Sequence, residues 1–298
     1  MSRPTVNPGR REAFLAADFP ERTAIHDTVA AMKAEALEAR RALGNRYLER
    51  HGARCVVPRE TAFARLELSP EETAAAREEA MTLAEGRAAQ ADNRALEFPV
   101  LGKNFPADGA VLALASSPCL LAPIVRYFGM LPVLFNVFVT RAHTTELLPK
   151  SAHHFHLDPE DVLTHKVFVH LTDVDEDCGP LHVLPADTTQ TVLKAVDYRA
   201  IDRVTDEQVA DLVGWDSVVR FCGPAGTVVF ADTSRCLHFG GRPRRPGKPV
   251  RYHLVCQYLL PTSFLFPVRG DAEDPRHLPT LEPSGDEEWD ALIGACHT

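Results

Sequence analysis

Two residues of types that commonly bind metals stand two positions apart in the segment His156-Leu157-Asp158. Alternate side chains of a strand point to the same side, so this imidazole and this carboxylate can enter one cavity. Together they suit ferrous iron, provided that a third ligand comes from another part of the chain. A lone His-x-Asp recurs often by chance, and a local hydrogen-bonded turn is the competing interpretation.

A third possible ligand, His238, follows a segment with the pattern of a buried strand. Gly226 is succeeded by an apolar run and then by a polar stretch that ends at His238. Arg251 begins the next predicted strand, where a guanidinium can hold a carboxylate through two parallel hydrogen bonds. An oxygenase that uses 2-oxoglutarate needs such a group. His238 alone could equally be a packed core histidine, so the iron interpretation depends on the joint order of these residues.

The elements that must position these residues change in character along the chain. Composition and helix-start residues predict helices in the first third, over about 23–51, 70–90 and 107–128. From Pro132 onward, short apolar runs separated by Pro and Gly predict strands at 133–139, 165–171, 181–184, 218–221, 227–230 and 250–259. A short helix is expected over 200–214.

Helices followed by short strands predict an α+β fold, in which N-terminal helices pack against an antiparallel sandwich or barrel. A jelly roll is the natural candidate for the core. The chain of 298 residues suits one oxygenase-sized domain. We divide it into a mainly helical part (1–130), a β core (131–266) and a C-terminal tail (267–298).

Composition limits the classes of partner. The formal net charge of −9 argues against broad binding to nucleic acid or to an anionic membrane. It does not exclude a local basic pocket for a small anion, and a small-molecule substrate is expected. The seven cysteines are odd in number and form no Cys-x-x-Cys, which favours a reduced compartment. No signal-peptide pattern or membrane-length apolar run occurs, so a cytoplasmic location is expected, and the oligomeric state is left open.

At this point the chain resembles the phytanoyl-CoA dioxygenase family of non-haem iron(II)/2-oxoglutarate oxygenases, over roughly 103–260. The segments that carry the resemblance are His156-Leu-Asp158, 171–185 with its Gly179-Pro180-Leu181, 226–230, 232–238 and Arg251. The chain departs from the family at Pro185-Ala-Asp-Thr, where Pro-Gly-Ser-His is usual, and at Cys178, where Asn is common. Neither departure affects a ligand.

The resemblance implies a double-stranded β-helix, with iron(II) bound by His156, Asp158 and His238 and 2-oxoglutarate bound by Arg251. It also implies O2 as a co-substrate and the oxidation, usually hydroxylation, of an unactivated carbon, with release of succinate and carbon dioxide. Because the carboxylate ligand is kept, hydroxylation or desaturation is favoured over halogenation; related halogenases have a small residue there.

Four more residues match positions near the co-substrate in this family: Lys103, Asn136, Phe168 and His253. His253 stands where a small hydroxyl residue is common. The competing interpretation of Lys103 is a solvated surface lysine, and that of Asn136 and Phe168 is simple core packing.

Two other classes of protein compete with the oxygenase. His154, His156 and Glu160 superficially match the first motif of a cupin metal site, as in a metal-dependent isomerase or binding protein. The second motif requires a histidine soon after Gly226, and the next one is His238. A non-catalytic binding or sensor module of the same fold is the third possibility, and the intact ligand set argues against it.

A basic segment lies between the third ligand and Arg251. A solvated hairpin loop is its simplest interpretation, and the alternative is a mouth for an anionic substrate. Its basic residues are Arg242, Arg244, Arg245 and Lys248.

Overall fold

The computed structural model describes residues 8–88, 100–101, 105–142, 154–199, 201–240, 242, 251–266 and 281–298. The N-terminal half is mainly helical, as predicted. Its elements are α1 (Pro8–Ala16), α2 (Phe19–Met32), α3 (Ala34–His51), β1 (Phe63–Glu67), α4 (Pro70–Ala88), β2 (Val100–Leu101), α5 (Ala110–Ala115) and α6 (Pro118–Phe128).

Strands dominate the rest of the chain, with two helices inserted between them. The elements are β3 (Val133–Ala142), β4 (Thr164–His170), β5 (Leu181–Val183), α7 (Ala186–Ala195), α8 (Asp206–Val213), a 3-10 helix (Trp215–Ser217), β6 (Val219–Phe221), β7 (Thr227–Asp232), β8 (His238–Phe239), β9 (Arg251–Leu259) and α9 (Glu287–Leu292).

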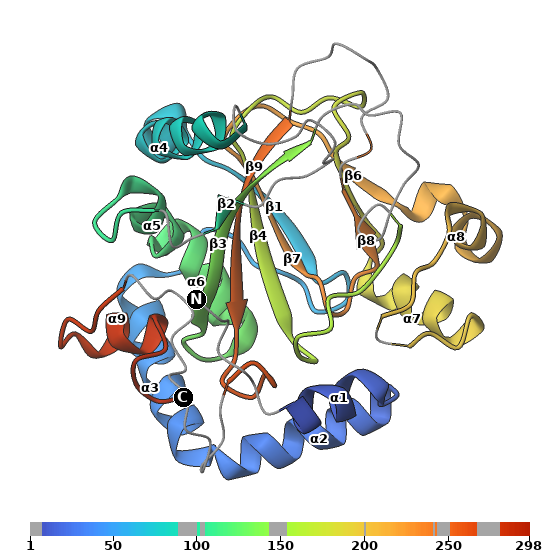
Figure 1. Cartoon of the computed structure of the whole chain (residues 1–298), viewed down its shortest axis with the longest axis horizontal. Coiled ribbons are helices and arrows are strands. Elements are labelled where there is room, and N and C mark those ends of the chain that lie inside the picture. The colour runs from blue at the N-terminus through green and yellow to red at the C-terminus, as the bar shows by residue number, and fades with distance from the viewer. Residues whose placement is uncertain are drawn as a thin grey trace.

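The strands form two antiparallel sheets. Six strands pair in the order β1-β7-β4-β9-β3-β2, and three pair in the order β6-β5-β8. In Figure 1 the helices α3 to α6 lie on one side of the larger sheet, whereas the small sheet, α7 and α8 lie on the other side. The predicted combination of N-terminal helices and antiparallel strands is therefore confirmed.

Several predicted boundaries were wrong, for identifiable reasons. The helix expected over 107–128 is two helices, because Pro118 starts α6 and has no N–H with which to continue α5. The helix expected over 23–51 is divided at Lys33, whose backbone leaves the helical region. Strand β1 was not predicted within the helical part, and it forms the edge of the larger sheet beside β7.

The two faces of the larger sheet differ in the side chains that they carry. Val137, Val139 and Tyr258 are buried toward the helices, and the Tyr258 hydroxyl donates to the carbonyl of Ala115 at 2.5 Å. Alternate positions point the other way. Lys166, for example, stands directly opposite Gln257 on the face turned away from the helices.

No helix among the described residues is long and apolar enough to cross a membrane.

Helix α2 is attached to the β region by a buried polar contact. His26 Nδ1 lies 2.9 Å from Asp161 Oδ1, and the Thr262 hydroxyl donates to the other carboxylate oxygen at 2.7 Å. Lys33 adds a hydrogen bond to the carbonyl of Pro261 at 2.7 Å. Because Asp161 follows Asp158 by three positions, the N-terminal helices brace the loop that carries a possible ligand.

This contact predicts a pH-dependent contribution to stability. Burial opposes a charge on His26, but the hydrogen bond and the charge of Asp161 outweigh it and raise the His26 pKa above 6.5. A group whose pKa is higher in the folded protein than in the unfolded chain stabilises the fold at pH values below its unfolded pKa. This stabilisation is lost as the pH rises through its folded pKa. His26→Gln should therefore lower the free energy of unfolding by about 1 kcal/mol more at pH 5.5 than at pH 8.5 in urea titrations.

Thr262→Val is the matched control, because it removes a hydrogen bond to the same carboxylate without removing a titrating group. Its effect on the free energy of unfolding should be equal at the two pH values. An equal effect of His26→Gln at both pH values would contradict the assignment.

Candidate metal centre

The two histidines of the predicted site are direct partners across two chain segments. His156 forms a β-bridge with His238, the first residue of β8, and each backbone N–H donates to the other residue's carbonyl at 3.1 Å. The Asp158 N–H donates to the carbonyl of Thr233 at 2.9 Å. The chain from Thr233 to His238 thus brings together all three predicted ligands, whose ligand atoms lie within 4.8 Å of one another.

Both imidazoles are oriented by backbone carbonyls. His156 Nδ1 lies 2.9 Å from the carbonyl of His154, and His238 Nδ1 lies 3.0 Å from that of Cys236. A carbonyl only accepts, so each Nδ1 carries the proton and each Nε2 carries a lone pair. This is the arrangement found in metal-binding histidines, where a hydrogen bond from the second nitrogen sets the tautomer.

The protonation states also suit metal binding. Burial raises the pKa of Asp158, but the charge of Lys166 opposes burial most strongly, and this pKa is held well below its usual range. Burial, reinforced by His238, lowers the pKa of His156 to about 3, and burial also lowers that of His238. The site therefore presents a carboxylate and two neutral imidazoles, which are the forms that bind a cation.

Lys166 is a site residue that the sequence interpretation missed. It lies on β4, and its Nζ is 2.7 Å from Asp158 Oδ2, the oxygen that is also 3.7 Å from His238 Nε2. The available signal was strand alternation: Lys166 precedes Phe168, which had been singled out, by two positions and so shares its face. A charged residue on a strand is more often solvent-facing, and only 15% of this side chain is exposed.

The segment between β7 and β8 is held from the helical side. The carboxylate of Asp232, at the end of β7, accepts hydrogen bonds from the Tyr127 hydroxyl at 2.8 Å and from the Ser234 hydroxyl at 2.6 Å. Arg235 donates to the Tyr127 oxygen at 2.8 Å. Helix α6 thereby fixes the backbone that leads to His238.

Three of the residues predicted to bind the co-substrate, Asn136, Phe168 and His253, lie on one face of the larger sheet. Gln257 on the central strand β9 pairs with Asn136 on β3 and with Lys166 on β4, so the three side chains share one face. Phe168 and His253 share this face by strand alternation, and their rings meet edge to face at 6.3 Å.

Arg251, the first residue of β9, is two positions from His253 and 2% exposed. Its positive charge adds to burial in lowering the pKa of His170 and of His253. Lys103 lies outside the described residues.

The predicted basic loop is described only at Arg242. Its guanidinium pairs with Asp206 at 2.6 Å and stacks over the Phe239 ring at 3.6 Å. Arg242 is thus attached to the start of α8. The other three basic residues of the loop lie outside the described residues.

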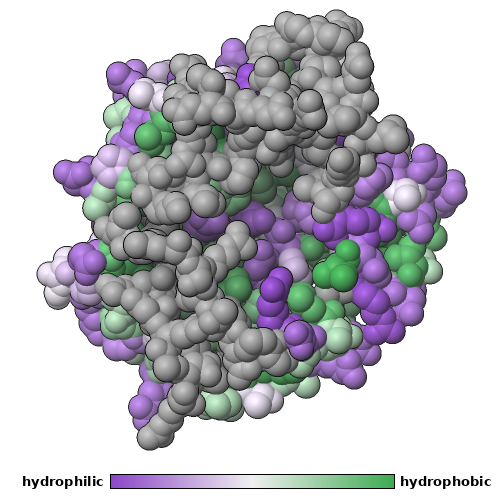
Figure 2. Space-filling view, in the orientation of Figure 1, coloured by the Kyte–Doolittle hydropathy of each residue, from purple (hydrophilic) through white to green (hydrophobic). Residues whose placement is uncertain are grey.

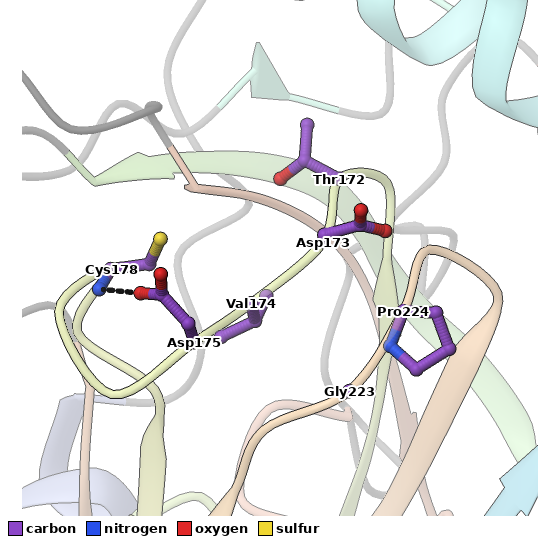
Figure 3. Close-up of a pocket in the computed structure, with 7 residues that line it drawn as sticks. All are labelled: Thr172, Asp173, Val174, Asp175, Cys178, Gly223 and Pro224. Carbon is purple, nitrogen blue, oxygen red and sulfur yellow. Dashed lines mark hydrogen bonds between the residues drawn. The ribbon is translucent and has the colours of Figure 1, made fainter.

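A surface pocket of about 490 Å³ lies at the end of β4 and contains none of the three ligands. Figure 3 shows Asp175 turned toward the Cys178 N–H, which donates a hydrogen bond to Asp175 Oδ1 at 2.9 Å. Asp173 accepts the Ala225 N–H at the same distance. Asp175 therefore supports a local turn, and Asp173 joins this segment to the turn that precedes β7. On the face of the molecule seen in Figure 2, hydrophilic and hydrophobic residues are mixed.

Comparison with known proteins identifies a fold. No protein-family model and no curated protein matches the chain. Among solved structures, EctD from S. alaskensis with 2-oxoglutarate and 5-hydroxyectoine matches with a TM-score of 0.52 and 17% identity over 68% of this chain and 74% of that one. The same protein with bound Fe matches with a TM-score of 0.51 and 18% identity, over 76% of this chain and 82% of that one.

At these identities the likeness shows a shared fold. A carbocyclase from nogalamycin biosynthesis, SnoK, described as non-haem and alpha-ketoglutarate dependent, is similar at a TM-score of 0.49 and 20% identity, over 76% of this chain and 88% of that one.

The geometry predicts the outcome of metal titrations. Asp158→Asn and His238→Ala should each weaken the binding of ferrous iron, measured anaerobically by calorimetry, by more than about 100-fold, because each removes a ligand atom. His154→Ala is the matched control, since His154 supplies only its backbone carbonyl to His156. Loss of metal binding in His154→Ala with retention in Asp158→Asn would instead support the cupin ligand set.

Proposed function

We propose that the protein is an Fe(II)/2-oxoglutarate-dependent oxygenase similar to the phytanoyl-CoA dioxygenases, built on a double-stranded β-helix. It would hydroxylate an unactivated carbon of a small molecule and release succinate and carbon dioxide. The observation that carries the proposal is the group of His156, Asp158 and His238, with both Nε2 lone pairs and one carboxylate converging within 4.8 Å.

This donor set fits ferrous iron. Two imidazoles and one carboxylate on one side of a metal leave further coordination positions for a co-substrate and oxygen. When bound, iron and 2-oxoglutarate would supply the activation of O2, which no protein side chain performs.

The residues around the ligands would set their orientation. The carbonyls of His154 and Cys236 keep the Nε2 atoms of the two histidines available. Lys166 Nζ forms an ion pair with Asp158 Oδ2 at 2.7 Å and so restricts rotation of the carboxylate. Because Asp158 and His238 are buried, water has limited access to the centre, which strengthens these electrostatic interactions.

The co-substrate would lie along the sheet face that Lys166 and Arg251 share. Arg251 would pair with its distal carboxylate, since a guanidinium offers two parallel donors. Asn136, Phe168 and His253 lie on the same face, and Lys103 remains a proposed contact. The substrate would be a small molecule.

The fold shared with EctD supports this proposal, because crystals of that protein contain iron in one case and 2-oxoglutarate with 5-hydroxyectoine in another. We further propose a cytoplasmic location, in line with seven free cysteines among the described residues.

Activity measurements test the proposal. Purified protein supplied with ferrous iron, 2-oxoglutarate and air should release succinate, slowly alone and faster with its substrate, and Asp158→Asn should abolish the release. Arg251→Met should raise the KM for 2-oxoglutarate by at least about tenfold, because a charged hydrogen-bonding pair is lost.

Arg220→Met is the matched control. This arginine is exposed on β6 and pairs with Glu176 at 3.2 Å, so the KM should not change. Iron binding without succinate release under any substrate would favour a binding module or an isomerase. An unchanged KM in Arg251→Met would remove Arg251 from the co-substrate site.

A further inference from the structure

Helix α2 lies along the segment that carries two of the predicted metal ligands, residues 155–161, which we call the ligand segment. In Figure 1, α1 and α2 lie at the lower edge of the view, beneath the strands. Phe19, Arg22 and His26 are spaced by three and then four positions, so their side chains share one face of α2. This face meets the surroundings of the ligand segment at three successive points.

The first two contacts reach the backbone between the ligands. Phe19 packs against the apolar cluster that contains Phe155 and Leu157, which flank a ligand in the chain. Burial lowers the pKa of the Arg22 guanidinium, and the nearby Tyr198 opposes that shift. The Tyr198 hydroxyl in turn accepts the Leu157 N–H at 3.0 Å. The first half of α2 thus supports the middle of the ligand segment.

The third contact is polar and largely buried. His26 Nδ1 lies 2.9 Å from Asp161 Oδ1, and the Asp161 side chain has no exposed surface. One turn further on, Val29 is buried, and Lys33 Nζ donates to the carbonyl of Pro261 at 2.7 Å. The contact face of α2 therefore extends along the whole ligand segment.

The backbone of the ligand segment is hydrogen-bonded at three consecutive residues. His156, Leu157 and Asp158 each donate their N–H to a partner outside the segment. Two of these bonds place the ligand side chains beside His238. A hydrogen-bonded amide exchanges its hydrogen with solvent when the bond opens, so these three amides report whether the segment is in place.

Helix α2 is attached to the rest of the protein through little buried surface. Two of its fourteen residues, Arg22 and Val29, are buried. It is separated from α3 at Lys33, whose backbone angles of φ −106° and ψ 20° are not helical. Elements with few buried apolar contacts open locally at a lower free energy than the core. Opening of α2 therefore needs less free energy than opening of the sheets.

We propose that α2 is a clasp on the ligand segment, and that its opening controls the exchange of metal at the centre. The closed clasp holds His156 and Asp158 against the third ligand, His238. When α2 opens, the ligand segment loses its three contacts together, and the backbone bonds that bring the ligands together break more often. The second half of this inference rests on the proposed function, because it requires iron at the centre.

Hydrogen exchange of the full chain tests the clasp without added metal. His26→Ala removes a hydrogen bond to a charged group, so it should speed exchange of the amides of residues 156–158 about tenfold. The amide of Val29 in α2 should accelerate by the same factor, and the amides of β4 should not change. Alanine favours a helix more than histidine does, so loss of helix propensity would not explain the acceleration.

Thr28→Ala is the matched control. Thr28 lies on the exposed side of the same helix, and its hydroxyl donates to the carbonyl of Ala24 within that helix at 2.8 Å. This variant should leave the exchange of residues 156–158 unchanged. Phe19→Ala, at the other end of the contact face, should accelerate it as His26→Ala does.

Iron release tests the consequence for the metal centre. A colorimetric chelator, used anaerobically, should remove ferrous iron about tenfold faster from His26→Ala and Phe19→Ala than from wild type and Thr28→Ala. Uptake of iron should accelerate by the same factor. The equilibrium affinity should change by less than about threefold, because the closed arrangement remains the main population.

The outcomes separate the clasp from the proposed function. No acceleration at residues 156–158 in His26→Ala, or an equal acceleration in β4, would overturn the clasp, since α2 would then open alone or only with global unfolding. Unchanged iron release, or faster release without faster uptake, would overturn its control of metal exchange. If wild type binds no iron, the proposed function and this control both fail, whereas hydrogen exchange still decides whether α2 holds the ligand segment.

Discussion

The structure of the site depends on one reciprocal pair of backbone hydrogen bonds, between His156 and His238. These residues are far apart in sequence, and the bridge brings their side chains to the same side with ring centroids 4.4 Å apart. A third backbone bond, from the Asp158 N–H to the Thr233 carbonyl, adds the carboxylate. Since all three bonds involve backbone atoms, the convergence of these side chains follows from strand register.

Register in turn depends on the packing of the larger sheet. One face is apolar and covered by α5 and α6, and a shift by one residue would exchange it with the polar face. The network of Tyr127, Asp232 and Arg235 connects α6 to the segment that precedes His238. The helices thus stabilise the sheet and also position the predicted metal ligands.

The other face carries an unusual amount of buried polarity for a protein core. Lys166 and Gln257 are neighbours near the ligands, and Arg251, His170 and His253 lie toward the other end of the same strands. Such groups destabilise a core unless a partner or ligand satisfies them. Their concentration on one face distinguishes a binding surface from packing.

Much of this arrangement could be predicted from the sequence. Apolar β-branched runs bounded by Pro and Gly gave strand limits within a few residues of β3, β4 and β9, because burial on both faces requires such runs. The ligand set was predicted because the types and order of its residues are specific, and the structure brings the three together.

Features that depend on long-range pairing could not be predicted. The sequence Phe63-Ala-Arg-Leu-Glu67 has no strong strand pattern, and it becomes β1 because β7 offers a free edge. Lys166 is indistinguishable from a solvated lysine until Asp158 is placed beside it. The stacked rings of His170 and His253 meet only through the register of β4 with β9.

The most direct test of the central claim is an anaerobic crystal structure with ferrous iron and 2-oxoglutarate. The account predicts iron bonded to the Nε2 atoms of His156 and His238 and to a carboxylate oxygen of Asp158. Iron bonded to His154 or Glu160, or the absence of iron from this cluster, would contradict it.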